Sequence, residues 1–194
     1  MPYDTDTDPY LDPDTGILRN SLGITTQAEL DEAEADISTV VLAALPDNPI
    51  PGNFDLRHLQ AIHKALFGSL YPWAGELRTV EMTKEATRFA NPEFLEKAAA
   101  ALFDELHKEN LLRNLSDETY VERLAHYFSE VNILHPFREG NGRTQRAFFT
   151  LLAMEAGHRI KWESIDADQN LAASIAAYQG DESGLATMLA SLLA

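Results

Sequence analysis

The chain has 194 residues, 45% of them hydrophobic and 24% charged, which are the proportions of a folded protein with a sizeable core. Its 31 acidic and 15 basic side chains give a net charge of −16, a field that repels nucleic-acid backbones and anionic membrane surfaces. We therefore expect no direct nucleic-acid partner. No cysteine is present, which excludes disulfides, zinc–thiolate centres and thiol nucleophiles. Without an apolar run of about 18 residues or a leader-like start, we expect a cytoplasmic protein with no membrane span.

The N-terminal region is the most acidic part of the chain. Residues 1–50 hold 11 acidic side chains and one basic side chain, and five aspartates lie within the first 15 residues. Segments of this composition are usually extended and solvated. We predict an acidic N-terminal arm over residues 1–20, followed by one folded domain over residues 21–194.

Helix signals dominate the first half of that domain. Thr26 and Glu29 form a capping box, and the helix that they open is predicted to end at Pro46. Its apolar face at helical spacing consists of Leu30, Ala33, Ile37, Val40 and Val41. A second helix is predicted over residues 54–70, with an apolar stripe made of Leu59, Ile62 and Leu66.

Five further helices are predicted along the rest of the chain. Asn91 and Pro92 are typical of a helix start, and the helix should bury Phe94, Ala98, Leu102 and Leu106. The next helix starts at Ser116 and carries Leu124, Phe128 and Val131. Another runs from Gly142 to Gly157, and two shorter helices follow. Strand composition occurs only over residues 77–82 and 87–89, which predict a hairpin flap at about 77–90. The expected fold class is an all-α bundle with one small β-hairpin flap.

The segment 135–146, His-Pro-Phe-Arg-Glu-Gly-Asn-Gly-Arg-Thr-Gln-Arg, carries the chemistry. Pro136 ends the preceding helix, and two glycines allow a ligand to approach the backbone closely. The next helix begins at about Asn141, so its unpaired N–H groups point into the loop and favour an anion. Arg143 and Arg146 are three residues apart, which places them on one face of the first turn. Together these groups predict a site for a polyphosphate.

Two more residues of this loop suggest a reaction rather than binding alone. Glu139 adds a carboxylate beside phosphate-binding groups, an arrangement that suits Mg²⁺. His135 is the group of the segment with an ordinary pKa near neutrality, so it can accept a proton from an attacking hydroxyl. These residues point to phosphoryl or nucleotidyl transfer.

The same residues also have structural interpretations. A lone histidine is usually an ordinary buried one, and the two arginines can pair with Glu139 on a helix surface. The dipole at a helix start disfavours arginines, which weakens the second interpretation. We expect a structural role for the remaining histidines, which are His58, His63, His107, His126 and His158. Their spacing does not predict a zinc site.

The segment resembles the signature of Fic-domain proteins, His-Pro-Phe-x-(Asp/Glu)-Gly-Asn-Gly-Arg-x-x-Arg, at every specified position. Residues 70–75, which contain Trp-Ala-Gly, and the hairpin after them are similar to the family's turn and substrate-positioning flap. Residues 10–24 resemble the lead-in of the Fic toxins that occur in toxin–antitoxin pairs. The resemblance implies a Fic-fold helical bundle over most of the chain.

The resemblance also implies an activity, the transfer of AMP from ATP to a hydroxyl side chain of a target protein. His135 would be the base and Glu139 would hold Mg²⁺. The ATP-binding positions implied by the family are Arg138, Gly140, Asn141, Gly142, Arg143 and Arg146, with Lys84 and Glu85 at the flap tip. The flap would bind an extended segment of the target by strand addition.

Family regulation implies a partner. Many Fic proteins carry an inhibitory helix with the pattern (Ser/Thr)-x-x-x-Glu-(Gly/Asn), whose glutamate pairs with the second arginine of the signature, here Arg146. Only Thr25 and Glu29 have the required spacing in this sequence, and Leu30 stands where glycine or asparagine is needed. We expect a small antitoxin to supply the glutamate, and by analogy DNA gyrase or topoisomerase IV as the target.

Two other functions stay open. Related Fic-type enzymes act as kinases or phosphocholine transferases, and the kinase type usually departs from the signature at its second glycine or second arginine. Gly142 and Arg146 are both present here. A non-catalytic module that binds a nucleotide or a protein is the other alternative, and an incomplete signature would favour it.

Overall fold

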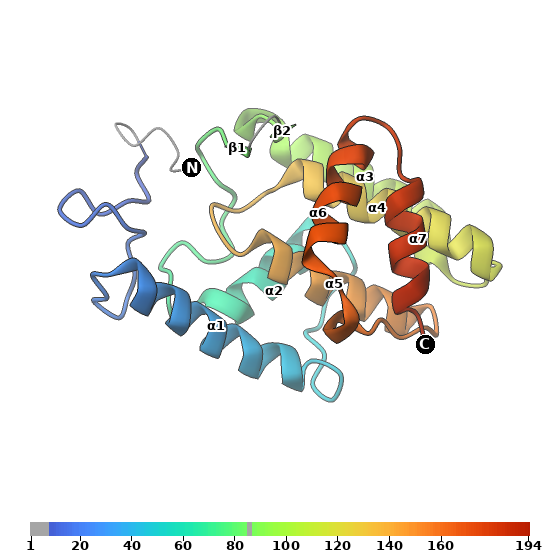
Figure 1. Cartoon of the computed structure of the whole chain (residues 1–194), viewed down its shortest axis with the longest axis horizontal. Coiled ribbons are helices and arrows are strands. Elements are labelled where there is room, and N and C mark those ends of the chain that lie inside the picture. Colours follow the sequence, from blue (N-terminus) through green and yellow to red (C-terminus); the bar gives the residue numbers. More distant parts are fainter. Residues whose placement is uncertain (1–7, 85–86) are drawn as a thin grey trace.

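The protein folds into seven α-helices with one antiparallel two-stranded hairpin, in a computed structural model that describes residues 8–84 and 87–194 (Figure 1). The all-α class with a small hairpin is therefore confirmed. The helices are α1 (Gln27–Ala44), α2 (Leu56–Phe67), α3 (Leu95–Lys108), α4 (Asp117–Leu134), α5 (Asn141–Glu155), α6 (Ala167–Tyr178) and α7 (Ser183–Leu192). The strands are β1 (Thr83–Lys84) and β2 (Thr87–Arg88).

Side-chain caps fix the starts of several helices, as the sequence predicts. The Thr26 hydroxyl accepts from the Glu29 amide and donates to the Glu29 carboxylate at 2.6 Å, so the two predicted residues cap the start of α1. Asp55 caps α2 and Ser116 caps α4 in the same way. The second helix is shorter than predicted, because it begins after Asp55 and ends before Gly68.

The buried face of α3 differs from the prediction at its start. Asn91 caps a short 3₁₀ turn, Pro92–Phe94, and the α-helix begins only after it. A 3₁₀ turn has fewer residues per turn than an α-helix, so the helical spacing used for the prediction does not hold across it. Phe94, the last residue of the 3₁₀ turn, is exposed, and Ala98 inside α3 is exposed as well, whereas Leu102 and Leu106 are buried as predicted. The residues that α3 buries are Leu95, Ala99, Leu102, Phe103 and Leu106.

The inner face of α1 is also different from the apolar face that spacing predicts. Val40 is 72% exposed, whereas Glu34 and Ser38 are buried. Leu30 is fully buried, and Ala33, Ile37 and Val41 pack partly against the core. A polar pair therefore stands in the middle of an otherwise apolar interface.

The paired part of the flap is shorter than predicted. Thr83 pairs with Arg88 and Lys84 with Thr87, so the ladder lies at the tip of the flap. Residues 77–82 are not part of a strand, and the backbone amide of Arg78 donates to the Pro136 carbonyl at 2.9 Å. The flap is thus joined to the loop of the signature at its base.

The N-terminal arm is folded against the helices from residue 8 onward. An isolated bridge joins Leu11 to Leu18, and the Ser21 amide donates to the Leu70 carbonyl at 2.7 Å. Ile17 and Leu18 are each only 8% exposed. Residues 8–20 therefore differ from the solvated arm that composition predicts, because two apolar side chains give this segment something to bury.

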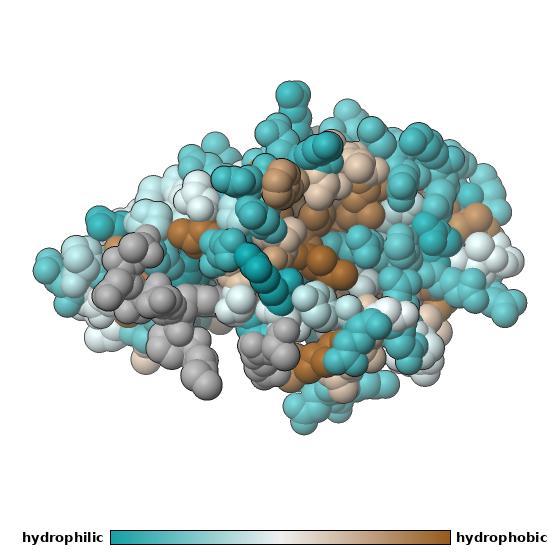
Figure 2. All heavy atoms as spheres, turned by 90° about the horizontal axis from the view of Figure 1, so that it is seen from above, coloured by the Kyte–Doolittle hydropathy of each residue, from teal (hydrophilic) through white to brown (hydrophobic). Residues whose placement is uncertain are grey.

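Helices α4 and α5 form the centre of the bundle. Helix α5 packs against α2 and α4, while α6 and α7 pack on each other and on α4 (Figure 1). Hydrophilic side chains cover most of the face in Figure 2, and apolar side chains reach the surface near its middle. Within the described ranges, no helix combines the length and the apolar character that a membrane crossing requires. This arrangement brings the C-terminal end of α4 and the start of α5 together with the flap.

Candidate active site

A cavity of about 1500 Å³ lies between the flap, the loop of the signature and α6. Of the residues that the sequence singles out, it is lined by His135, Arg138, Glu139, Asn141, Gly142, Arg146 and Lys84. Arg143 and Gly140 are not among the lining residues. Glu85 lies outside the described residues. The opposite wall comes from α6 and the residues before it, including Ile165, Asn170 and Leu171, which the sequence does not mark as part of a site.

His135 forms the C-cap of α4 in a left-handed backbone conformation, with φ 44° and ψ 58°. This conformation stops the helix and turns the chain into the loop. The ring stacks on Phe89 of the flap, with 3.8 Å between ring centres and 13° between planes. Its Nδ1 atom is buried and has no hydrogen-bond partner in the described part of the chain. Stacking therefore helps to orient the imidazole.

The surroundings of His135 keep its imidazole neutral. Burial lowers the pKa of His135 to about 3, and the positive charges of Arg78 and Lys84 act in the same direction. Arg78 is 2% exposed and donates from Nε to the His135 carbonyl at 2.7 Å and from Nη1 to the Val80 carbonyl at 2.6 Å. The sequence around Arg78 alternates polar and apolar residues, so it does not single out this arginine.

Asn141 and Gly140 fix the conformation of the loop that follows His135. Asn141 accepts from the Phe137 amide at 2.9 Å and donates to the Phe137 carbonyl at 2.7 Å, so its side chain closes the loop. Gly140 has φ +77°, and a Cβ at this position would lie 2.3 Å from the Phe67 ring. Only glycine fits there without displacing the core.

The start of α5 presents backbone donors to the cavity. The first N–H groups of a helix have no carbonyl partner within the helix, and here they belong to Asn141, Gly142 and Arg143. Gly142 lines the cavity, and a Cβ built on it would meet only Arg146 Nη1, at 3.8 Å. The backbone at Gly142 is therefore open to a ligand.

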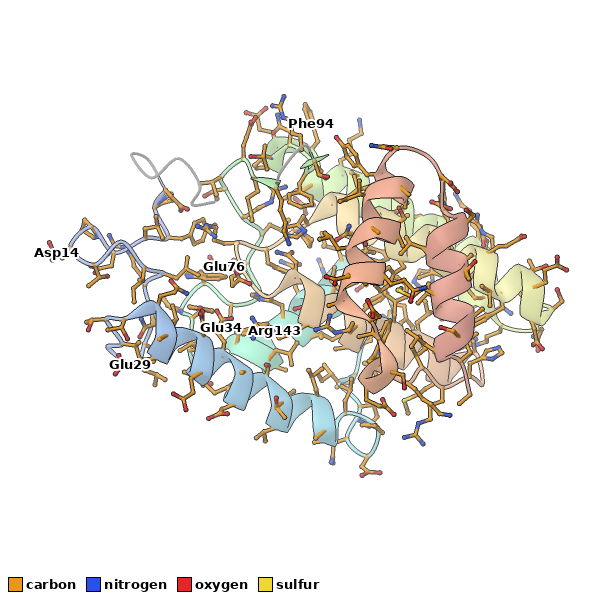
Figure 3. All side chains as sticks on the ribbon, viewed as in Figure 1. Asp14, Glu29, Glu34, Glu76, Phe94 and Arg143 are labelled. Carbon is orange, nitrogen blue, oxygen red and sulfur yellow. The ribbon has the colours of Figure 1, made fainter. Side chains whose placement is uncertain are left out.

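The two arginines of the signature point in different directions. Arg146 lines the cavity and forms no ion pair within the described ranges, while burial and the charge of Arg143 lower its pKa. Arg143 instead pairs with Glu34, and Figure 3 shows these two side chains meeting between α1 and α5. The expectation that both guanidinium groups face one ligand is thus not met by the structure.

Glu34 explains why Arg143 turns away from the cavity. Its carboxylate also accepts a hydrogen bond from the Tyr71 hydroxyl, and burial together with Glu34 raises the pKa of Tyr71. The Arg143 guanidinium lies over the Phe67 ring, 4.8 Å from its centre. Because the buried glutamate comes from α1, no pattern near the signature indicates this pairing.

Glu139 combines a cavity position with a raised pKa. Burial is the main cause, and the nearby charge of Glu34 adds to it, whereas the Gly140 amide, Arg143 and Arg138 lower the pKa. The carboxylate accepts from the Gly140 amide at 2.8 Å and lies 3.8 Å from Arg143. One oxygen is thus held by the backbone at the cavity wall.

Arg138 forms a buried ion pair with the N-terminal segment. Its Nε donates to Asp8 at 2.8 Å, and both side chains are 5% exposed. Asp8 itself lines the cavity. Sequence reasoning could not find this contact, because 130 positions separate the two residues.

His63 connects the loop to the turn before the flap, in agreement with its expected structural role. Its Nδ1 accepts from the Gly75 amide at 2.8 Å, so its Nε2 donates to the Glu139 carbonyl at 3.0 Å. The ring stacks on Phe137 at 3.9 Å. Burial lowers the pKa of His63 to about 4, which keeps this neutral hydrogen-bonding form.

A second group of titratable residues lies away from the cavity. His126, Glu130 and Glu182 place ligand-type atoms within 4.8 Å of one another. His126 Nδ1 and a Glu182 carboxylate oxygen lie 3.2 Å apart in a hydrogen bond, which explains why these two side chains meet without a metal. Sequence spacing did not indicate this group because Glu182 comes from the start of α7.

Comparisons with known proteins agree with this geometry. A model of the Fic/DOC family matches residues 53–153. Protein adenylyltransferase VbhT of Bartonella schoenbuchensis is 40% identical over 187 residues, which cover 96% of this chain and 39% of that protein. The probable protein adenylyltransferase Fic of Salmonella typhimurium is 39% identical over 178 residues, which cover 92% of this chain and 88% of that protein.

Solved structures share the whole fold. BepC of Bartonella tribocorum, with bound AMPPNP, superposes with a TM-score of 0.87 at 28% identity and covers 95% of this chain and 96% of its own. A Fic domain from Bartonella quintana, with bound ADP, has a TM-score of 0.88 at 27% identity, with 95% and 94% covered. The family match, the similar sequences and the shared fold lead to one conclusion: this chain belongs to the Fic/DOC family.

Proposed function

We propose that this chain is a protein adenylyltransferase, which moves AMP from ATP to a hydroxyl side chain of a target protein. The observation that carries the proposal is that one cavity holds a neutral histidine, the open start of a helix and an arginine without an acidic partner in the described ranges. Its relatives VbhT and Fic are named for this activity. BepC was solved with a nucleotide analogue bound.

Each group has a distinct task in this reaction. His135 accepts the proton of the attacking hydroxyl, whose oxygen forms a bond to the α-phosphorus of ATP while the bond to the departing pyrophosphate breaks. The low pKa of His135 keeps its imidazole unprotonated in the free protein, and the negative triphosphate would raise that pKa on binding and so make the ring a stronger base. Arg146 and the backbone at Gly142 bind the phosphates and orient the α-phosphorus for attack.

Glu139 fits the role of a magnesium ligand. Its carboxylate stands at the cavity wall beside the phosphate-binding groups, and hard oxygen donors are what Mg²⁺ prefers. The ion would neutralise charge on the α- and β-phosphates. Arg143, whose guanidinium is engaged by Glu34, contributes to phosphate binding through its backbone N–H.

The flap is proposed to bind the target. Its tip carries the two short strands, and the exposed Lys84, the last residue of β1, is among the residues that line the cavity. An extended target segment can add to this edge and bring its hydroxyl to His135. Glu85 stays a proposed nucleotide contact from the family resemblance.

The biological setting is proposed by analogy. Arg146 faces the cavity without an acidic partner in the described ranges, so a small antitoxin could supply a glutamate to it and silence the enzyme. We accordingly propose a cytoplasmic toxin of a toxin–antitoxin pair that acts on DNA gyrase or topoisomerase IV. Co-expression with a neighbouring open reading frame tests this setting, since a cognate antitoxin should abolish toxicity.

A label-transfer assay tests the activity and separates it from the alternatives. The purified chain is incubated with Mg²⁺ and bacterial lysate, in parallel with α- and γ-labelled ATP. We expect protein labelling from α-labelled ATP alone, and none with His135→Ala, which should still bind ATP. Labelling from γ-labelled ATP alone would instead identify a kinase. Absence of both labels, with ATP bound, would favour a phosphocholine transferase or a non-catalytic module.

A further inference from the structure

The N-terminal segment contributes to the cavity although it lies outside the part of the chain that matches the family model. Asp8 lines the cavity and pairs with Arg138 at 2.8 Å. Its other carboxylate oxygen accepts from the Tyr10 amide at 3.0 Å. Both oxygens are therefore engaged, one by the loop of the signature and one by the segment's own backbone.

Tyr10 continues this contact to the base of the flap. Its hydroxyl accepts from the Thr79 amide at 3.1 Å, and Thr79 lines the cavity. The Tyr10 ring meets Trp73 edge-on, with 5.3 Å between ring centres. The segment thus touches both the loop and the flap.

Other contacts fix the two ends of the loop. Arg78 binds the His135 carbonyl at the beginning, and Asn141 binds both backbone groups of Phe137 near the end. Arg138 stands between them, next to Glu139. The buried pair with Asp8 therefore constrains the stretch of the loop that carries the proposed magnesium ligand.

We propose that Asp8 and Tyr10 are positioning residues of the transfer reaction, which set the spacing between loop and flap through Arg138 and Thr79. The expected kinetic effects rest on the proposed function. The expected structural effects rest only on the contacts described above. The Asp8 carboxylate contributes negative charge beside the buried Arg138 guanidinium, so its removal should weaken this contact.

The kinetic test uses Asp8→Ala with Asp14→Ala as its matched control. Asp14 is an exposed aspartate of the same arm and points away from the cavity in Figure 3. Rates are divided by the fraction of chain that binds ATP, which removes the effect of unfolded protein. We expect Asp8→Ala to lower kcat about tenfold or more with the affinity for ATP changed less than about threefold, because a small misplacement of reacting groups is costly. Asp14→Ala should match the wild type, and normalised rates that are equal in all three proteins overturn the proposal.

Two milder measurements keep the proposal testable if Asp8→Ala folds poorly. Tyr10→Phe removes only the hydroxyl that accepts from Thr79, and should lower kcat with a normal melting temperature. In a double-mutant cycle, adding Asp8→Ala to Arg138→Gln should lower kcat by a smaller factor than adding it to the wild type, because the contact between the two side chains is already lost. Effects that multiply would contradict the coupling.

Hydrogen exchange separates this inference from the proposed activity. If the wild type transfers no label at all, the adenylyltransferase proposal fails while the positioning can still be measured. Amides of residues 77–84, 87–90 and 135–140 should exchange faster in Asp8→Ala than in Asp14→Ala. Unchanged exchange in these stretches overturns the inference whether or not the enzyme is active.

Discussion

Gly140 and Gly142 stand two positions apart in one loop, but different constraints require glycine at each. A side chain at Gly140 would collide with Phe67, whereas one at Gly142 would meet only the end of Arg146 at 3.8 Å. The fold therefore needs the first glycine. At the second glycine the backbone is open toward the cavity, and a bound phosphate would approach it from that side.

Gly142→Ala should separate stability from binding. Alanine is favoured over glycine inside a helix, so the free energy of unfolding should rise by about 0.5–1 kcal/mol. The added methyl group should weaken ATP binding about tenfold by blocking the approach to the backbone. Urea unfolding and calorimetric titration with ATP measure the two effects. Gly140→Ala serves as the contrast and should lose stability, and unchanged ATP affinity in Gly142→Ala would contradict the assignment.

Phe89→Leu tests the stacking that orients His135. Leucine keeps an apolar side chain but gives up the parallel ring contact at 3.8 Å, so water gains access to the imidazole. The pKa of His135 should rise from about 3 toward its ordinary value, and the transfer rate should fall. An NMR titration of the histidines reports the pKa. Phe94→Leu is the matched control, because Phe94 is 58% exposed and lies at the edge of the molecule in Figure 3.

At the level of elements, local patterns predicted the helices better than their faces. The stripe of Leu59, Ile62 and Leu66 in α2 is buried as expected. In α3, Leu102 and Leu106 are buried as expected, but Phe94 belongs to a 3₁₀ turn before the helix, a detail that apolar spacing does not contain. The predicted apolar face of α1 did not include Glu34, which is buried because the Arg143 guanidinium of α5 pairs with it. The burial of Glu34 and the extent of the cavity both depend on contacts between elements that are distant in the sequence, which local patterns do not report.

The pairing of α1 with α5 makes a specific prediction for stability. Glu34→Gln removes the charge that matches Arg143, and hydrogen bonds to charged groups contribute about 1.5–3 kcal/mol. Because the Arg143 side chain is 22% exposed, we expect a loss near the lower end, about 1.5 kcal/mol. Chemical denaturation measures it. Glu32→Gln, an exposed neighbour on the same helix, should change little, and equal effects of both variants would argue against the pair.

For the whole molecule, the buried histidines predict a loss of stability in acid. Burial lowers the pKa values of His58, His63 and His135, to about 4 for His63 and about 3 for His135. Below about pH 6.5 the unfolded chain binds protons that the folded chain does not, so stability is complete above that pH and falls as the pH decreases. Each such histidine contributes a slope of up to about 1.4 kcal/mol per pH unit.

Unfolding by urea between pH 7 and pH 5 measures this slope. We expect His63→Gln to reduce it, because the group that must stay neutral between Gly75 and Glu139 is gone. His107→Gln, which changes an exposed histidine, should leave the slope as it is. A wild-type stability that is flat over this range would show that these histidines are protonated in the folded protein.

The wall that α6 contributes to the cavity has a consequence for synthesis on the ribosome. Ile165, Asn170 and Leu171 are made after the whole signature, and α6 is held in place by packing on α4 and α7. A nascent chain that has just completed residue 146 therefore has its histidine and arginines but only part of the surface that encloses a nucleotide. Translation itself would therefore delay nucleotide binding in an enclosed site until the later helices have docked.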